Sequence, residues 1–338
     1  MIEFYDREKE IEEIIRILGT RPDLITFIYG PINSGKTELL NNLIGKLGKD
    51  YVVFYVNLRG KFITDYEDFI RVLFRFRDVS KDEILKEVLK KSLKALSFKG
   101  IPVPESVVDL IFSKKRTEDV FEFLEDYLTN VAEKKVPVLI IDELQVIGDL
   151  KVDELLIYKL FNFFIRLTKE LHCCHVFAVT SDSLFIERVY SEAMLQGRCR
   201  YILVDDFDHK TTEGFLRKYG FSEEEIKVVW EYFGGKPVYL VEAVKNKHRL
   251  KDFCEEMLKI RVGQIEEVVF RLEVENKELF KSVVELLGEV KEKEKVRYRF
   301  VTNDISFLVR NNVLFADPVT KTVKPQSKLD LLAIRDVI

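Results

Sequence analysis

Residues 30–37 combine two glycines, a lysine and a hydroxyl side chain at a spacing that can hold phosphate groups. The stretch GPINSGKT places four residues between Gly30 and the run Gly35-Lys36-Thr37. This is the pattern of a phosphate-binding loop, whose backbone N–H groups and following helix N-terminus hold phosphate oxygens. We expect Lys36 to reach the β- and γ-phosphates and Thr37 to bind Mg²⁺. The residues of this predicted nucleotide site are Gly30, Pro31, Ile32, Asn33, Ser34, Gly35, Lys36, Thr37 and Glu38.

A second set of candidate residues follows an apolar run in the stretch VPVLIIDEL. Asp142 ends this run and can hold Mg²⁺ through water, as a Walker B acid does. Glu143 is then placed to polarise the attacking water as a general base. The alternative for Glu143 is a solvated acid that caps a helix, and we favour catalysis. Gln145 could report on the nucleotide or face a neighbouring subunit.

Two further stretches contribute candidates with open alternatives. Thr180, Ser181 and Asp182 end another apolar run, and a hydroxyl there can bind the γ-phosphate or position the water. We prefer Ser181, with Thr180 second, and Asp182 is equally well interpreted as a helix cap. In QGRCRYILV, Arg198 or Arg200 could neutralise transition-state charge, within the chain or across a subunit boundary. The alternative for Arg198 is a surface salt bridge.

The elements that would position these residues alternate between apolar strands and helices. Continuous apolar runs predict strands buried on both faces, and amphipathic spacing predicts helices. Alternation of the two predicts an α/β fold with a parallel sheet, whose carboxyl ends bind nucleotides. Strands are expected at 24–30, 51–58, 136–144, 174–181 and 200–207, and helices at 1–20, 36–47, 65–130 with a break near 100–104, and 152–171.

Composition limits the class of protein. The 338 residues carry a net charge of −4, so no overall basic field indicates nucleic acid. No apolar run approaches the roughly 20 residues of a membrane helix, and the N-terminus lacks a signal peptide's apolar centre. We therefore expect a cytoplasmic protein with no membrane partner. The stretch HCCH at 172–175 resembles a metal cluster, but four consecutive strand residues cannot close on one ion, so we interpret it as a strand entry.

The C-terminal third predicts two smaller units. Residues 209–258 are helical around FGGKPVYL, and the chain from about 265 predicts a helix, a short helix and two strands around a turn at Asp317-Pro318. The second pattern resembles a winged helix. We therefore expect a nucleotide-binding core at 1–208, a helical lid at 209–262 and a winged-helix-like domain at 263–338.

The order of these pieces resembles the archaeal ATPase family, in the STAND and AAA+-like branch of P-loop NTPases. The resemblance covers nearly the whole chain and includes FYDREKEI, GPINSGKT, IDELQ, QGR and GGKP. It implies ATP as the nucleotide, with Tyr5, Asp6 and Arg7 near the base. The GGKP stretch is similar to the G-x-P motif of STAND proteins, which implies that Gly235 and Pro237 lie near the base as well.

These observations leave three hypotheses. The first is an ATPase that couples ATP binding and Mg²⁺-dependent hydrolysis to a conformational switch of the lid and winged-helix-like domain. The second is a nucleic-acid-binding module whose affinity for duplex DNA is controlled by ATP, although residues 291–299 carry five basic and two acidic side chains and the next helix has one basic residue. The third is a scaffold that holds nucleotide without turnover, which Glu143 argues against. A protein partner at the C-terminal domain, or an oligomer, is compatible with each.

Overall fold

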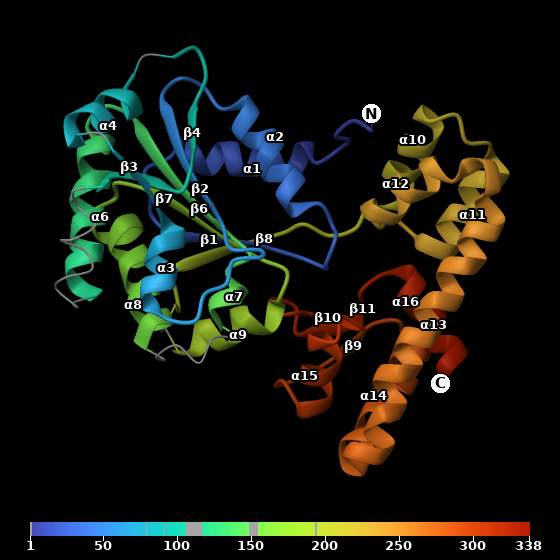
Figure 1. The fold of residues 1–338 in the computed structure, drawn as a ribbon. Coiled ribbons are helices and arrows are strands. Elements are labelled where there is room, and N and C mark those ends of the chain that lie inside the picture. The colour runs from blue at the N-terminus through green and yellow to red at the C-terminus, as the bar shows by residue number, and fades with distance from the viewer. Residues whose placement is uncertain (1, 79, 91, 106–116, 149–154, 193–194) are drawn as a thin grey trace.

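The protein comprises a sheet-containing body and a helical C-terminal half, which Figure 1 shows side by side. The two parts are joined by the chain that leaves β8 and enters α10. The hairpin of β10 and β11 returns from the C-terminal half to the sheet body, where Phe315 of β10 packs in the main core. The computed structural model describes residues 2–78, 80–90, 92–105, 117–148, 155–192 and 195–338.

The main sheet has six parallel strands in the order β4-β2-β6-β7-β1-β8. Tyr29 at the end of β1 pairs with Thr180 of β7 and Leu203 of β8, and Asn57 of β2 pairs with Asp142 of β6. The loops that follow these strands therefore share one edge of the sheet, which confirms the predicted arrangement. The strand bounds are β1 (Ile25–Tyr29), β2 (Tyr51–Asn57), β4 (Leu96–Lys99), β6 (Val136–Asp142), β7 (His175–Thr180) and β8 (Cys199–Leu203).

Helices cover both faces of this sheet because its strands are apolar on both sides. Phe27 and Phe54 pack in one core cluster, and Ile28 and Val53 pack in another, as expected for neighbouring residues of a strand. The second cluster is closed by α1 (Glu8–Leu18) and α2 (Lys36–Lys46). The first is closed by α3 (Tyr66–Leu73), α6 (Thr117–Ala132), α8 (Leu155–Ile165), which continues as a π-helical turn (Arg166–Glu170), and α9 (Ser183–Glu192).

The prediction of a helical segment over 65–130 is wrong in its middle, although the expected break near 100–104 is confirmed as a strand, and residues 106–116 lie outside the described residues. Between α3 and α6 lie α4 (Lys81–Val88) and three short strands, of which β4 adds an edge to the main sheet. The pair β3 (Phe74–Arg77) and β5 (Ile101–Pro104) forms a small sheet of its own. Gly100, at φ 83°, turns the chain between β4 and β5. Four-residue strands give too short an alternation to be separated from helix by pattern alone.

The C-terminal half contains the elements that the winged-helix prediction requires, together with a third strand that the sequence did not predict. Strands β10 and β11 form the expected hairpin, and β9 adds to it in an antiparallel sheet. The proposed boundary at 262/263 lies inside the continuous helix α13, so this division stays a prediction. The bounds are α10 (His209–Lys218), α11 (Glu223–Phe233), α12 (Pro237–Lys245), a 3₁₀ turn (Lys247–Arg249), α13 (Leu250–Glu275), α14 (Lys277–Lys293), β9 (Val296–Arg297), α15 (Asn303–Arg310), β10 (Leu314–Asp317), β11 (Thr322–Pro325) and α16 (Lys328–Val337).

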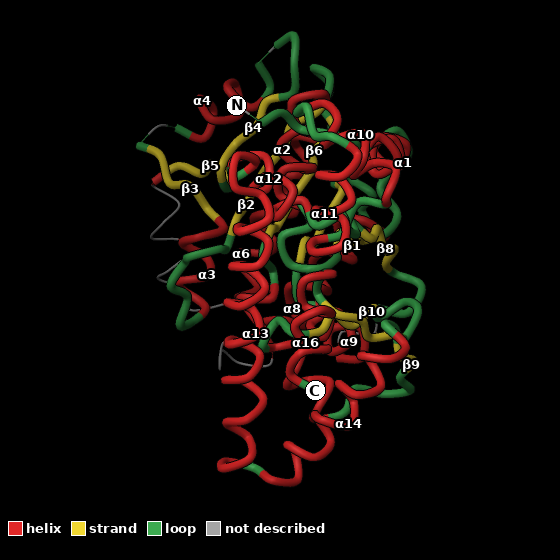
Figure 2. Tube along the Cα trace, turned by 90° about the vertical axis from the view of Figure 1, so that its right-hand side faces the viewer, coloured by secondary structure: helices red, strands yellow, loops and turns green. Residues whose placement is uncertain are grey.

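Helices α13 and α16 join the lid to the C-terminal sheet. Leu329 of α16 packs in the core cluster of α10–α12, whereas Ala333 and Ile334 of the same helix pack with α14 and α15. Arg261 of α13 pairs with Asp330 of α16 at 2.6 Å. Figure 2 shows α13 and α16 adjacent from a second direction. The lid and C-terminal elements are thus packed on shared helices.

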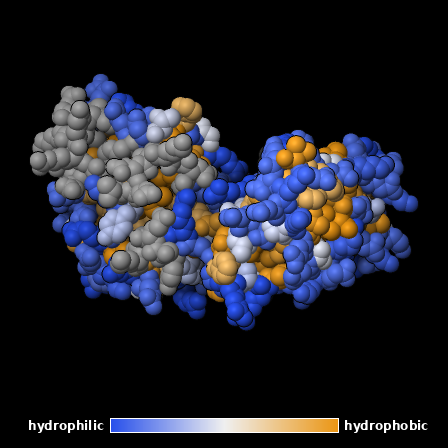
Figure 3. Space-filling view, turned by 90° about the horizontal axis from the view of Figure 1, so that it is seen from below, coloured by the Kyte–Doolittle hydropathy of each residue, from blue (hydrophilic) through white to orange (hydrophobic). Residues whose placement is uncertain are grey.

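The surface of the C-terminal half carries apolar area between charged side chains, visible in orange in Figure 3. The large apolar side chains that are exposed on α13 are Ile260, Phe270 and Val274. Among the residues that the structure describes, no helix is long and apolar enough to cross a membrane.

Candidate nucleotide site

The phosphate-binding loop connects β1 to α2 at the carboxyl edge of the sheet. Lys36 is buried, and its Nζ donates to the carbonyl oxygens of Gly30 at 3.0 Å and Pro31 at 2.9 Å. Burial lowers the pKa of Lys36 to about 8. The Lys36 ammonium therefore bonds to carbonyl oxygens of its own loop. From this position it can exchange these carbonyls for the oxygens of a bound phosphate.

Two positions of this loop have backbone constraints that limit the residue type. A Cβ added to Gly30 would lie 2.1 Å from the carbonyl oxygen of Val204, because β1 and β8 run side by side there. Gly35 precedes α2 with φ 94°, a left-handed conformation that favours glycine. Close packing excludes a side chain at Gly30, and the left-handed backbone favours glycine at Gly35, which together explain both glycines of the motif.

Asp142 lies opposite Thr37 across the end of the sheet. Its Oδ2 accepts from the Thr37 hydroxyl at 3.0 Å and from the Tyr55 hydroxyl at 2.7 Å, and its Oδ1 accepts from the Glu143 N–H at 3.0 Å. Burial raises the pKa of Asp142, which a nearby cation would reverse. A hydroxyl and a carboxylate are the hard oxygen donors that Mg²⁺ prefers, so this donor set fits the predicted ion.

Glu143 is buried, and two side chains hold its carboxylate in place. Its carboxylate accepts from the Arg59 guanidinium and from the Gln145 side-chain amide, and Gln145 in turn accepts from the Thr180 hydroxyl at 2.8 Å. Glu143 also has φ 60°, a strained conformation that is often found at functional sites. Gln145 begins the short helix α7 (Gln145–Gly148). Through its hydrogen bonds to Glu143 and Thr180, Gln145 connects the ends of β6 and β7 within this chain.

Arg59 is a functional candidate that the sequence analysis missed. It follows β2 directly, at the same sheet edge as the phosphate-binding loop. Its position after a buried strand was the one feature of the sequence that could have indicated a role at the site. Cations are common in loops, however, and the contact with Glu143 arises only in the folded chain.

The residues at the end of β7 divide their roles. Ser181 lines a cavity together with Lys36, Thr37 and Glu143. Asp182 instead accepts from the backbone N–H of Leu184 at 2.9 Å, so it caps α9, as the alternative interpretation held.

Two adjoining cavities run along the phosphate-binding loop. The first, of ≈ 340 Å³, is lined by Tyr5, Arg7, Phe207 and Phe215 among others. The second, of ≈ 370 Å³, is lined by Lys36, Thr37, Arg59, Glu143 and Ser181 among others. Together they form a groove with aromatic side chains at one end and phosphate-binding groups at the other. The residues that line both cavities are Gly35, Glu38, Pro237 and Val241.

The residues before α1 lie at the aromatic end of this groove. The Arg7 guanidinium donates to the carbonyl oxygens of Ser34 at 2.8 Å and Asp205 at 2.6 Å and stacks 4.6 Å from the Phe207 ring centre. Asp6, also described, lines neither cavity, whereas Tyr5 lines the first. Gly235 supports this end from behind, because Phe207 N–H donates to its carbonyl oxygen at 2.9 Å.

Comparison with known proteins agrees with this geometry. A family described as an ATPase domain predominantly from Archaea matches residues 4–243, and the C-terminal domain of a group of uncharacterized ATP-binding proteins matches residues 251–338. This chain belongs to that archaeal ATPase family. An uncharacterized ATP-binding protein of Methanocaldococcus jannaschii is 49% identical, with 100% of this chain and 98% of the relative covered.

Solved structures show the same fold at low sequence identity. The Walker-type ATPase of Pyrococcus abyssi superposes with a TM-score of 0.66 at 18% identity, over 98% of this chain and 96% of that one. The Aeropyrum pernix ORC2 protein, in its ADPNP–ADP complexes, gives a TM-score of 0.51 at 12% identity, over 99% and 93%. The predicted AAA+-like fold is thereby confirmed.

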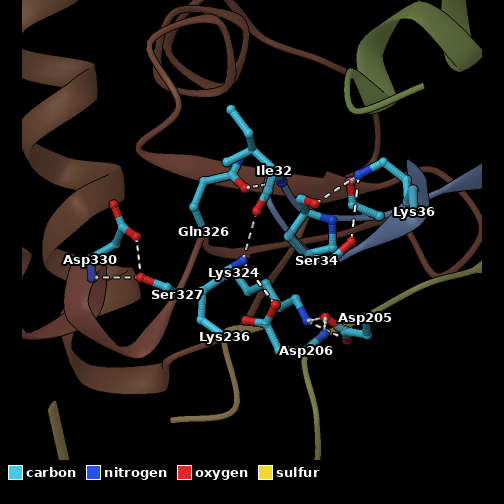
Figure 4. A network of polar contacts seen from close by, with 12 residues as sticks. Ile32, Ser34, Lys36, Asp205, Asp206, Lys236, Lys324, Gln326, Ser327 and Asp330 are labelled. Carbon is cyan, nitrogen blue, oxygen red and sulfur yellow. Dashed lines mark hydrogen bonds and ion pairs between the residues drawn. The ribbon is translucent and has the colours of Figure 1, made fainter. Parts of the chain in front are cut away.

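The phosphate-binding loop is also held by the lid and by the C-terminal sheet, as Figure 4 shows. The Ile32 N–H donates to Oε1 of the buried Gln326 at 3.1 Å, and the Ile32 carbonyl accepts from Lys236 at 3.1 Å. Lys236 also pairs with Asp206 at 2.9 Å. Tyr29 donates to Asp317 at 3.0 Å, which connects β1 to β10. No motif in the sequence indicated a role for Gln326.

The structure does not bring Arg198 or Arg200 to the candidate nucleotide site. Arg198 precedes β8, and its carbonyl bonds Ile25 at the start of β1. Arg200 pairs with Asp23 at the same edge. The five residues of β8 span about 16 Å, which separates this edge from the phosphate-binding loop. The interpretation of Arg198 as a catalytic group within the chain is therefore corrected, and a role across a subunit boundary stays a prediction.

Proposed function

We propose that this protein binds ATP with Mg²⁺, hydrolyses it, and uses the nucleotide state to move its lid and C-terminal domain. The aromatic end of the groove suits a base, and the loop end suits a triphosphate. Tyr5 and Phe207 would contact the adenine, and Arg7 would fix the chain that carries them. Pro237 and Val241 of α12 would close over the nucleotide from the lid.

The phosphate end assigns a role to each group. Lys36 would leave the carbonyls of Gly30 and Pro31 for the β- and γ-phosphates. Thr37 and Asp142 would hold Mg²⁺, which neutralises charge on the phosphate oxygens when it is bound. Glu143 would accept a proton from the attacking water once its carboxylate leaves Arg59, and Ser181 would hydrogen-bond the water or the γ-phosphate.

The proposed switch rests on one observation, the two hydrogen bonds that hold the backbone of Ile32. Phosphate-binding loops hold phosphates with backbone N–H groups, yet here one such N–H donates to Gln326 and the neighbouring carbonyl is held by Lys236. Both partners come from outside the sheet body. Nucleotide that reorganises the loop must therefore displace these contacts, and the energy of that exchange biases the position of the lid and C-terminal domain.

The test combines turnover with a distance. ATP hydrolysis by the purified protein is measured with Mg²⁺, with Lys36→Ala as the inactive control. Spin labels at Lys49→Cys on the sheet body and at Val274→Cys on α13 then report the distance between the two parts with and without ATP. Both side chains are exposed, so labelling should leave the core intact. Turnover with an unchanged distance would retain the ATPase and overturn the switch. No turnover and no ATP binding would overturn the proposed function itself.

The DNA-binding alternative receives less support. Helix α15 would be the recognition helix of a winged helix, and its one basic side chain is Arg310. A helix that reads duplex DNA needs several basic contacts with the backbone phosphates. The hypothesis would be sustained by duplex binding that falls steeply with salt and is lost in Arg310→Ala.

A further inference from the structure

A third cavity lies beside the nucleotide groove, on its β2–β4 side. It has a volume of ≈ 530 Å³, and its lining includes Thr37, Arg59, Lys61 and Lys99. This volume is within the range of small-molecule and nucleotide pockets. Thr37 and Arg59 line both this cavity and the phosphate end of the nucleotide groove. The cavity and the nucleotide groove therefore meet at Arg59, which holds the Glu143 carboxylate.

The lining of this cavity is positively charged. It contains three cations, Arg59, Lys61 and Lys99, and no carboxylate. Within the described part of the chain, neither Lys61 nor Lys99 forms an ion pair, and both are exposed. The acids that follow in the chain are already engaged: Asp65 caps α3, Asp68 accepts from Thr64, and Glu67 pairs with Arg71. In a chain of net charge −4, such a pocket is suited to an anionic ligand.

An exposed aromatic side chain lies next in the sequence to a residue that lines this cavity. Phe62 directly follows Lys61 in the loop between β2 and α3, and 88% of its surface is exposed. Gly60, with φ 68°, turns the chain just before it. An exposed aromatic ring beside cations is the combination on which the bases and phosphates of single strands bind. A duplex would not supply the same contact, because its bases are stacked inside the helix.

We propose that this cavity and Phe62 bind a single-stranded nucleic acid, with a backbone phosphate between Arg59, Lys61 and Lys99 and a base on the Phe62 ring. Arg59 then has two competing partners, the Glu143 carboxylate and the bound phosphate. A strand in the cavity draws Arg59 from Glu143, and the freed carboxylate can accept the proton of the attacking water. This acceleration rests on the proposed ATPase function, whereas strand binding does not.

The binding test uses the full chain and a labelled oligothymidylate strand, followed by fluorescence anisotropy over a salt series. Three phosphate-contacting cations predict a slope of log affinity against log salt of about −2, and Lys99→Ala should reduce its magnitude by about 0.7. Phe62→Ala should weaken binding at least about fivefold. The matched controls are Val274→Ala, at a side chain that is also 88% exposed, and Lys227→Ala, at an exposed lysine of α11. Both should bind like the wild type.

Three outcomes would overturn the inference. The first is the absence of strand binding at low salt. The second is that Phe62→Ala binds the strand as tightly as the wild type does, or that the wild type binds an abasic strand of the same length equally tightly. Either result would reduce the site to anion binding alone. The third is equal binding of a polyglutamate peptide, which would assign the surface to an acidic protein.

ATP turnover, measured with and without the strand, separates this inference from the proposed function. The expected result is a strand-dependent increase in the wild type that is lost in Lys99→Ala. Strand binding without any ATP turnover would contradict the proposed function and leave the strand site standing. Turnover that the bound strand does not change would contradict the coupling through Arg59.

Discussion

The phosphate-binding loop is held on its two sides by contacts of very different range in the sequence. On one side, Lys36 bonds to carbonyls five and six positions away. On the other, Ile32 is held by Lys236, 204 positions away, and by Gln326, 294 positions away. The first side contains the chemistry and is encoded in one short segment. The second side depends on how the lid and the C-terminal sheet pack against the loop. A change in the conformation of the loop can therefore reach the lid and the C-terminal sheet through these contacts.

The largest expected effect is on the chemical side, in Glu143→Gln. The amide keeps the shape of the side chain and can still contact Arg59 weakly, but it cannot accept a proton. Turnover should fall at least about 100-fold, the contribution of a positioned general base, while ATP binding by calorimetry stays near the wild-type value. Turnover like that of the wild type would remove Glu143 from the mechanism.

The next effect tests the long-range side at Gly235. A Cβ there would lie 1.8 Å from the Phe207 carbonyl oxygen, a backbone atom that cannot yield without moving the chain between β8 and the lid. Gly235→Ala should lower the free energy of unfolding by about 1–3 kcal/mol.

Gly263→Ala is the matched control for this change. Gly263 lies within α13, and an added Cβ there meets nothing within 4 Å. Alanine should stabilise the helix by about 1 kcal/mol. Thermal unfolding of the two variants should therefore shift in opposite directions, and equal shifts would contradict the close contact between Gly235 and the chain that follows β8.

The same contrast explains what the sequence could and could not predict. Lys36, Thr37, Asp142 and Glu143 were found because each stands in a short motif at the end of a strong apolar run. The strand β4 was missed because LSFK is short and lies at the sheet edge, so two of its residues are half-buried and two are exposed. Such a strand lacks the continuous apolar pattern of a central one.

Long-range contacts were beyond the reach of pattern reasoning for a different reason. Arg59 and Gln326 have no motif, and their roles arise only when β2 ends beside β6 and when β11 ends beside the phosphate-binding loop. Arg198 was recognised as standing just before a strand, but its catalytic interpretation overlooked which edge of the sheet this position reaches. Sequence order puts it before β8, at the edge opposite the carboxyl ends.

A smaller effect is expected when the contact between Gln326 and the loop is removed. Gln326→Ala frees the Ile32 N–H for nucleotide and removes one bond that closes the loop. Since one such hydrogen bond is worth about 0.5–1.5 kcal/mol, ATP should bind roughly two- to tenfold more tightly. Gln264→Ala is the control, because Gln264 accepts from Arg261 on exposed α13. Weaker ATP binding by Gln326→Ala would show that Gln326 supports the loop instead of restraining it.

The smallest effect concerns the proton on Lys36. Burial lowers its pKa to about 8 in the free protein, and bound phosphates would raise it by favouring the ammonium. ATP binding must then take up a proton above about pH 8, so affinity should fall about fourfold between about pH 7 and about pH 8.5. ATP itself does not contribute, because its phosphates are already ionised there. Calorimetry in buffers of different ionisation enthalpy measures this uptake directly.

Because the pKa of Lys36 is depressed on folding, the free protein should also gain stability as pH rises from about 8 towards the ordinary lysine value. Proton uptake of the same size in a Lys36→Ala variant that still binds ATP would assign the effect to another group and leave the short-range side of the loop without its titrating residue.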